Sequence, residues 1–320
     1  MLKDRNSINK YIWILPVTVF IILAIIFNIV NGGVFLSPLN IRLLLINSVI
    51  QTFFAWGFSF IFASGVTDFS LGGVLLIAST MTGTLANMWG YPGVIIGGVG
   101  TGVLLLLINF TIYDLTRLPT WITALGLTMI YESVMANYSR FRMNAGLQVV
   151  SIESDYRALS KFPYIFIVFA IGLILAYFIY NRTTVGMNIR AAGSSPGIAK
   201  MMGVNVRTAY ISAGLIAGIF MGIAAFLNEG YSERVIAMTG LSSISLIFQP
   251  LASVLMAQVL SKYKINLMFA IPICAVIIKL TFNMLTIAGV PSGTWQETIL
   301  GVFVIVFGII SQRGYKGVVK

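Results

Sequence analysis

Long apolar runs with almost no charge constrain this chain more than any other feature. Runs of about 17–25 such residues have the length of a helix that crosses a bilayer. The candidate runs are residues 11–30, 43–64, 70–88, 93–113, 119–138, 163–181, 208–227, 240–260, 266–285 and 296–311. Charged residues are 9% of the 320, against about 25% in soluble domains. We therefore expect an all-α polytopic membrane protein of about ten transmembrane helices, folded as a single domain over residues 1–320.

The distribution of basic residues predicts an orientation. With ten spans and the N-terminus inside, the inner segments hold 13 Lys and Arg residues and the outer segments hold 6. An excess of positive charge marks cytoplasmic loops. We expect both termini and residues 182–207 on the cytoplasmic side of a plasma membrane. The run 11–30 is too long for the apolar part of a signal peptide and lacks a small-residue cleavage site, so we expect it to be retained.

The order of the spans also predicts an internal duplication. Spans two to five begin outside, whereas spans seven to ten begin inside. Two four-span units of opposite orientation are typical of an inverted repeat.

Several chemistries are excluded by composition. The chain has no histidine, and its lone Cys274 lies in an apolar run, so we expect no metal site, no cofactor and no disulfide. It has no phosphate-binding loop of the Walker type; "GGVGTG" at 97–102 lies inside a span with no strand before it. The net charge of +11 is spread over loops, which records orientation rather than nucleic-acid binding. We do not expect an enzyme.

One hydrophilic interruption, "TTVGMNIRAAGSSPGIAKMMGVNV" at 183–206, stands between two apolar runs. Ser194-Ser195-Pro196 is typical of a helix start, and Gly203 is placed to end that helix in a left-handed cap. The sequence predicts one short helix of at most two turns, with Ile198, Met201 and Met202 on one face. Such a face suits an adaptable docking surface or lies along lipid headgroups.

This interruption resembles the cytoplasmic loop of permeases from ATP-binding-cassette (ABC) importers of ribose, xylose, galactose and related simple sugars. The matching positions are Thr184, Gly186, 189–191, Gly193, Pro196, Ala199, Gly203 and Val204. The sequence departs at Ser195, where the family usually has Asn, and at Ile198, where it usually has Ala. The resemblance implies a coupling helix that docks on a separate ATPase. The residues that it assigns to this contact are Thr184, Gly186, Arg190, Gly193, Ser195, Pro196, Ala199, Lys200, Met201 and Gly203.

Other segments extend the resemblance. "GVTDFSLGGVLLI" at 65–77, "LPTWITALG" at 118–126 and the C-terminal "GTWQETILGVFVIVFGIISQR" look familial. The eighth span lacks the family's glycine-rich run, so we expect it to pack differently. This departure leaves open the solute class and whether the chain pairs with a second copy or with a related permease.

Polar side chains inside apolar runs are costly and therefore candidates for function. The candidates for the translocation path are Asn47, Gln51, Asp68, Ser70, Asn109 and Asn283. Asp68 is interpreted either as the support of a broken helix beside the path or as an interfacial helix cap. Asn47 and Gln51 either face the solute or join helices. Lys279 needs a counter-ion, for which Glu132 and Glu297 are candidates.

Three classes of function remain open. The resemblance implies an ABC importer permease that moves a small neutral solute, a monosaccharide or related furanose, with ATPase subunits, an extracytoplasmic binding protein, a second permease and membrane lipid as partners. The alternative is an ion-coupled secondary transporter, for which Glu132 is the one carboxylate deep in a span. An intramembrane enzyme is poorly supported, because no catalytic constellation is visible.

Overall fold

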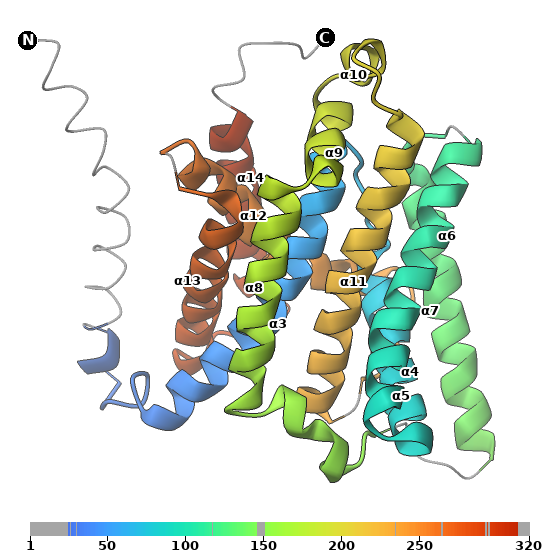
Figure 1. Cartoon of the computed structure of the whole chain (residues 1–320). Helices are drawn as coiled ribbons and strands as arrows, with labels where there is room; N and C mark the ends of the chain where they lie inside the picture. Colours follow the sequence, from blue (N-terminus) through green and yellow to red (C-terminus); the bar gives the residue numbers. More distant parts are fainter. Residues whose placement is uncertain are drawn as a thin grey trace, which may run out of the picture. The chain divides into compact units, whose positions relative to one another are not determined.

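The computed structural model describes residues 25, 27–29, 31–116, 118–145, 151–233, 235–263, 265–291, 293 and 295–312. Regular structure in these residues is helical throughout (Figure 1). Most of the predicted first span, 11–30, lies outside them. The principal helices are α3 (Pro38–Ala63), α4 (Leu71–Trp89), α5 (Tyr91–Ile95), α6 (Thr101–Thr116), α7 (Thr120–Asn144), α8 (Tyr164–Arg182), α9 (Thr184–Ser194), α10 (Pro196–Met201), α11 (Val206–Ser232), α12 (Ser245–Ser261), α13 (Leu267–Ile287) and α14 (Trp295–Gln312).

Seven helical stretches among the described residues are long and apolar enough to cross a membrane. They are α3, α4, the stretch Tyr91–Thr116, α8, α11, the stretch Ser242–Ser261 and α13. The apolar part of α14, Trp295–Ser311, is shorter. The predicted span 119–138 forms α7, which has 25 residues but is not among the seven. The expectation of a polytopic all-helical membrane protein is confirmed.

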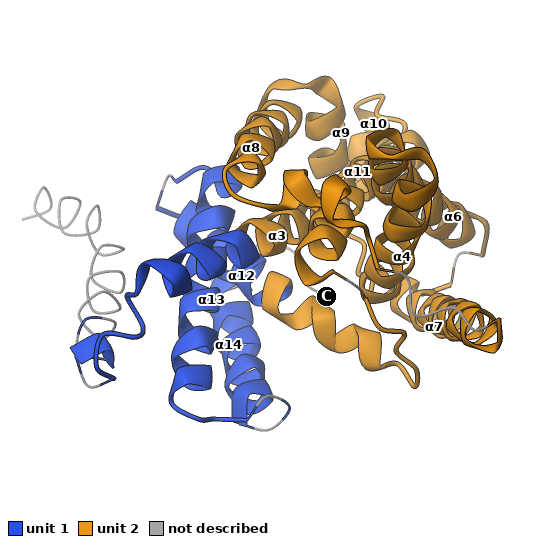
Figure 2. Ribbon diagram, turned by 90° about the horizontal axis from the view of Figure 1, so that it is seen from below, with its two compact units in different colours: residues 1–48, 251–320 blue, residues 49–250 orange. Residues whose placement is uncertain are grey.

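The chain divides into two compact units, shown in different colours in Figure 2. Unit 1 comprises Met1–Ser48 and Leu251–Lys320, and unit 2 comprises Val49–Pro250. The boundaries fall inside α3 and α12.

Helix α11 is the centre of unit 2, where it packs on α6 and α4 (Figure 1). A Cβ atom on Gly222 would lie 2.4 Å from the Cα of Val99, and one on Gly218 would lie 2.6 Å from the Cα of Val103. Glycine at both positions therefore lets the two backbones touch, as small residues do between membrane helices. Val99 lies in a π-helical turn, Ile96–Gly100, between α5 and α6.

Aromatic side chains fill the space between α3, α8 and α11. The indole of Trp56 is stacked on Phe169 with 5.8 Å between ring centroids, and Phe60 is stacked on Phe220 at 5.7 Å. Trp56, Phe60 and Phe220 are fully buried. Such ring pairs stabilise a packed core beyond the area that they bury.

Unit 1 has a smaller core of Ala252, Ile278, Phe282 and Leu300, which joins α12, α13 and α14. A reciprocal amide pair connects the start of α3 to α13. Asn40 Nδ2 donates to Asn283 Oδ1 at 2.8 Å, and Asn283 Nδ2 donates to Asn40 Oδ1 at 3.0 Å.

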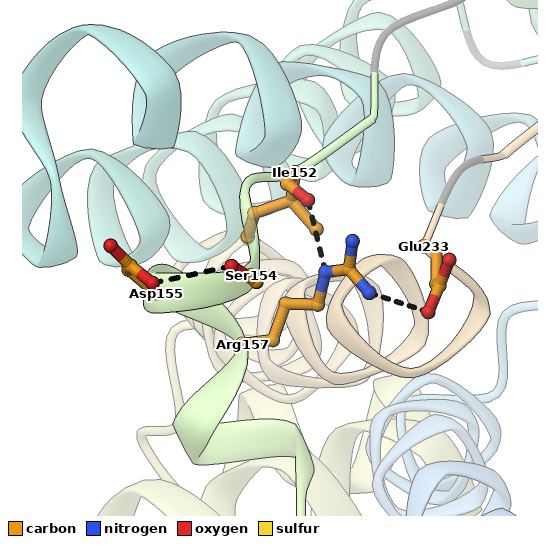
Figure 3. A network of polar contacts seen from close by, with 5 residues as sticks. All are labelled: Ile152, Ser154, Asp155, Arg157 and Glu233. Atoms are coloured by element: carbon orange, nitrogen blue, oxygen red, sulfur yellow. Dashed lines mark hydrogen bonds and ion pairs between the residues drawn. The ribbon is translucent and has the colours of Figure 1, made fainter.

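A polar network, drawn in Figure 3, stabilises the end of unit 2 that lies opposite α10 in Figure 1. Arg157, on the 3₁₀ turn Ser154–Ser160, forms an ion pair with Glu233 at 2.5 Å and donates through Nε to the carbonyl of Ile152 at 2.9 Å. The backbone N–H of Ile152 donates to the carbonyl of Glu233 at 3.2 Å. These contacts join the loop before α8 to the end of α11.

Candidate functional site

The hydrophilic interruption forms two helices, where the sequence predicted one. The side chain of Thr183 caps α9 by accepting a hydrogen bond from Gly186 N at 3.1 Å. A Cβ atom on Gly186 would lie 2.2 Å from the carbonyl oxygen of Ile179, so glycine permits the sharp turn from α8 into α9. The guanidinium of Arg190 lies 4.8 Å from the ring centroid of Tyr180, a favourable cation–π distance. Helix α9 is therefore fixed to the end of α8.

The C-terminal end of α9 is also fixed to the end of α3. A Cβ atom on Gly193 would lie 2.1 Å from the carbonyl oxygen of Ala63, and one on Gly65 would lie 3.1 Å from the carbonyl oxygen of Gly193. Gly65 has φ +77°, a left-handed value that suits glycine. Contact between the two backbones leaves no space for a side chain at Gly193.

Helix α10 confirms the predicted short helix and its boundaries. Ser195 has extended backbone angles at the N-cap position and Pro196 occupies the first turn, but the Ser195 side chain makes no capping hydrogen bond. Gly203 follows the helix with φ +82°, and Val204 N donates to the carbonyl of Ala199 at 3.0 Å, which is a left-handed C-cap.

The large apolar side chains of α10 and of Met202, which follows it, are exposed. Ala199 is 2% exposed and anchors the helix, whereas Ile198, Met201 and Met202 are 55%, 81% and 77% exposed. The predicted coupling residues of the interruption are thus all on α9, on α10 or at the turns that bound them. Figure 1 shows α10 at the tip of unit 2.

A second cluster of polar groups is buried between α3, α4, α6 and α7. Asp68 Oδ1 accepts a hydrogen bond from Ser70 N at 2.7 Å, and Asn109 Nδ2 donates to Ser70 Oγ at 2.6 Å and to Asp68 Oδ2 at 3.4 Å. The hydroxyl of Tyr131 donates to Asn109 Oδ1. Asp68, Ser70 and Asn109 are fully buried. Burial raises the pKa of Asp68, and its hydrogen bonds with Ser70 and Asn109 act in the opposite direction.

This cluster brings together three of the predicted path residues, Asp68, Ser70 and Asn109. Asp68 is buried and caps the backbone ahead of α4, which is compatible with both interpretations of this residue. The other three lie elsewhere. Gln51 donates to the carbonyl of Gln249 at 3.1 Å, Asn47 donates to the carbonyl of Leu43 at 2.8 Å, and Asn283 pairs with Asn40.

Glu132, on α7, holds the chain that leads into α12. Its two carboxylate oxygens accept hydrogen bonds from the backbone N–H groups of Leu241 and Ser243, each at 2.8 Å. Gly240 and Leu241 have φ values of +73° and +64°. A left-handed conformation is costly for leucine, and such strain persists where surrounding contacts fix it. The carboxylate therefore stabilises a strained turn.

The strained turn meets the start of α4. A Cβ atom on Gly72 would lie 2.0 Å from the carbonyl oxygen of Ser243, so only glycine permits this approach. The chain breaks its helical path just before α4 and again just before α12. The start of α4 and the turn before α12 are thus in direct contact.

A cavity of about 290 Å³ opens beside the same turn. Its lining comes from α7 and from the turn: Met129, Glu132, Ser133, Ala136, Asn137, Arg140, Thr239, Gly240 and Leu241. Sequence patterns did not predict the cavity, the Tyr131 hydrogen bond or the role of Glu132. The spacing of Ser133, Asn137 and Arg140 on one helix face would have been the signal for a polar surface there.

These features define a multi-pass helical membrane protein with a short exposed helix, α10, packed through α9 onto α3 and α8, and with a buried polar cluster at a helix break. The family described as "Branched-chain amino acid transport system / permease component" matches residues 40–308, and the chain belongs to it. This is a family of transport permease components rather than of enzymes.

Individual relatives are more distant. The chain is 26% identical to the fructose import permease protein of Rhizobium meliloti over 228 residues, which are 67% of this chain and 62% of the relative. It is 26% identical to the galactose/methyl galactoside import permease protein of Escherichia coli over 237 residues, covering 67% and 69%. It is 21% identical to the xylose transport system permease protein of Haemophilus influenzae over 285 residues, covering 69% and 76%. The match thus spans less than two thirds of the fructose permease. No solved structure matches the chain significantly.

Proposed function

We propose that this chain is the membrane subunit of an ATP-driven importer that moves a small, neutral, hydroxyl-rich solute, a monosaccharide or related furanose. Membership of a permease family supports transport. The names of the relatives, which are import permeases for fructose, galactose and xylose, support the solute class.

The observation that carries the proposal is the way in which α10 is held: its apolar face is exposed, and its base is fixed to other helices. A six-residue helix gains little stability from its own hydrogen bonds, yet this one exposes Ile198, Met201 and Met202 on a base that is fixed through α9 to α3 and α8. An exposed methionine-bearing face adapts to a protein partner. A rigid base transmits a push on that face into the membrane helices, which is what coupling to a separate ATPase requires.

The partners and orientation belong to the same proposal. The chain has no Walker loop of its own, so ATP hydrolysis falls to separate subunits docked on α10, in the cytoplasm together with both termini. An extracytoplasmic binding protein delivers the solute, and a second permease, identical or related, completes the complex in a bacterial plasma membrane.

An inverted repeat within a ten-span topology is also part of the proposal. Its support is the contact between two interrupted helix starts: Gly72 at the start of α4 against Ser243 just before α12. In folds with inverted repeats, corresponding helix breaks meet near the solute site. In this account Asp68, Ser70 and Asn109 support one break beside the path, and Asn47, Gln51 and Asn283 line other parts of it.

Reconstituted transport tests the proposal. The chain and its co-purifying subunits, placed in proteoliposomes with the binding protein, are supplied with each of ¹⁴C-labelled D-fructose, D-galactose, D-allose and D-xylose. We expect uptake that requires MgATP on the α10 side and persists with a protonophore. Uptake that needs no ATP and collapses with a protonophore would instead establish a secondary transporter.

A further inference from the structure

Helix α7 carries a polar stripe that its neighbours leave uncovered. Ser133, Asn137 and Arg140 recur at the spacing of one helix face, and all three side chains are exposed in unit 2. Helix α7 lies alongside α4 and α6, which are both in membrane-crossing stretches (Figure 1). Ser133 and Asn137 fall within the predicted span 119–138, and Arg140 lies just beyond it. Polar side chains at membrane depth are costly against lipid and line aqueous cavities or pathways.

The stripe forms one wall of the 290 Å³ cavity, and the strained turn Thr239–Leu241 forms another. Glu132 also lines the cavity, is 2% exposed and accepts hydrogen bonds from the backbone of Leu241 and Ser243. It therefore holds the turn in place and does not offer a free carboxylate. The cavity volume is near the lower end of the range for small-molecule sites.

The remaining polar groups of the wall are suited to hydroxyl groups. Asn137 Nδ2 donates to the carbonyl of Ser133 at 2.9 Å, which leaves the side-chain oxygen to act as an acceptor. Ser133 and Thr239 each supply a hydroxyl, and Arg140 supplies up to five N–H donors. Met129, Ala136 and Leu241 add apolar surface. Donors and acceptors beside apolar side chains match a sugar ring, which has hydroxyls at its rim and C–H groups on its faces.

The formal charges of the lining also indicate a neutral solute. The cavity has one carboxylate, Glu132, and one guanidinium, Arg140, so their charges balance. A site for a free anion or cation would carry an excess of the opposite charge.

We propose that this cavity is a transit site for a neutral polyol, contacted by Ser133, Asn137, Arg140 and Thr239 and shaped by the Glu132-held turn. The inference rests on the proposed function, because it assigns a contact site to the solute that the importer moves.

Cysteine labelling tests whether the stripe is wetted. Cys274 is the chain's single cysteine and is buried, so Cys274→Ala gives a clean background. Ser133→Cys and Asn137→Cys are compared with Val134→Cys, an adjacent and 52% exposed position outside the cavity lining. Only the ionised thiol reacts with a charged methanethiosulfonate reagent. We expect the two cavity cysteines in intact membranes of the full complex to react at least about tenfold faster than Val134→Cys. Equal rates at the three positions would overturn the cavity as an aqueous site.

Transport by matched variants tests solute contact. Asn137→Leu and Val134→Leu are assayed for uptake of each of the four labelled sugars that the unmodified chain imports. Loss of a hydrogen-bonding group to a bound hydroxyl lowers uptake at limiting sugar by about tenfold, whereas Val134→Leu retains it. Unchanged uptake by Asn137→Leu would overturn this inference alone and leave the importer proposal standing. If the unmodified chain imported none of the four sugars, the solute class assigned in the proposed function and in this inference would be wrong, whatever the labelling shows.

Discussion

The carboxylate of Glu132 accepts a hydrogen bond from the backbone N–H of Ser243 at 2.8 Å, although 111 residues separate them along the chain. Its second oxygen holds Leu241 N in the same way. In Glu132→Gln one oxygen becomes an amide NH₂ that faces a backbone donor, so one charge-assisted bond is lost. We expect the free energy of unfolding to fall by about 1.5–3 kcal/mol. Hydrogen exchange should accelerate at the amides of Leu241 and Ser243 and stay unchanged in α8; equal protection in both proteins would contradict the assignment.

Gly72→Ala tests the contact between the two helix starts. The new Cβ atom would lie 2.0 Å from the carbonyl oxygen of Ser243, so one backbone has to move. We expect destabilisation of about 1–3 kcal/mol, measured by thermal unfolding in detergent. Gly301→Ala is the matched control, since no atom lies within 4 Å of its Cβ position in α14. It should be neutral or stabilise by up to about 1 kcal/mol. Equal melting temperatures for the two variants would refute the close contact.

Asn109 connects three buried partners, so its loss should cost more than the loss of any one of them. Asn109→Leu keeps the branched arrangement of side-chain heavy atoms but removes the donor to Asp68 and Ser70 and the acceptor for Tyr131. We expect it to lower the free energy of unfolding by about 3 kcal/mol or more, because a buried carboxylate loses a donor. Tyr131→Phe removes one hydroxyl and should cost about 1 kcal/mol. Chemical unfolding of both variants gives the comparison, and a larger loss for Tyr131→Phe would argue against a network centred on Asn109.

Gly193→Ala tests whether the close contact between α9 and the end of α3 is needed for coupling to ATP hydrolysis. Its Cβ atom would lie 2.1 Å from the carbonyl oxygen of Ala63 and would push α9 away from the end of α3. We expect solute-stimulated ATP hydrolysis by the complex to fall at least about tenfold, the effect of about 1.4 kcal/mol of lost coupling. Gly126→Ala, on α7 and away from the proposed ATPase contact, meets no atom within 4 Å and should leave stimulation intact. A Gly193→Ala complex with full solute-stimulated ATP hydrolysis would show that the contact between α9 and α3 is not needed for coupling.

Local signals in the sequence predicted α10 well. Its start at Ser195-Pro196 and its end at Gly203 depend on backbone chemistry within a few residues, so a short window contains the information. Helix α9 was missed because its residues are small and polar, as in "NIRAAGS", and lack an apolar period of useful length. Contact with α8 and α3 stabilises that helix, and such contacts are not visible in a local pattern.

The partners of the buried polar groups, in contrast, could not be predicted from local sequence. Asp68 was identified as a buried polar residue, yet Asn109 is 41 residues away and Tyr131 a further 22. The role of Glu132 depends on partners more than 100 residues distant. Composition predicted that such groups need partners, but only the packing of the helices decides which partner each one meets. The cavity likewise requires the left-handed turn at Leu241, a conformation that a leucine gives no reason to expect.

Site-specific crosslinking from α10 tests the central claim most directly. In a Cys274→Ala background, a photoreactive maleimide is attached to Met201→Cys on α10, or to Met143→Cys, a 63% exposed position near the opposite end of unit 2. Illumination in native membranes should join Met201→Cys, and not Met143→Cys, to a nucleotide-hydrolysing subunit. If neither position, or both equally, captured such a subunit, α10 would not be the coupling contact.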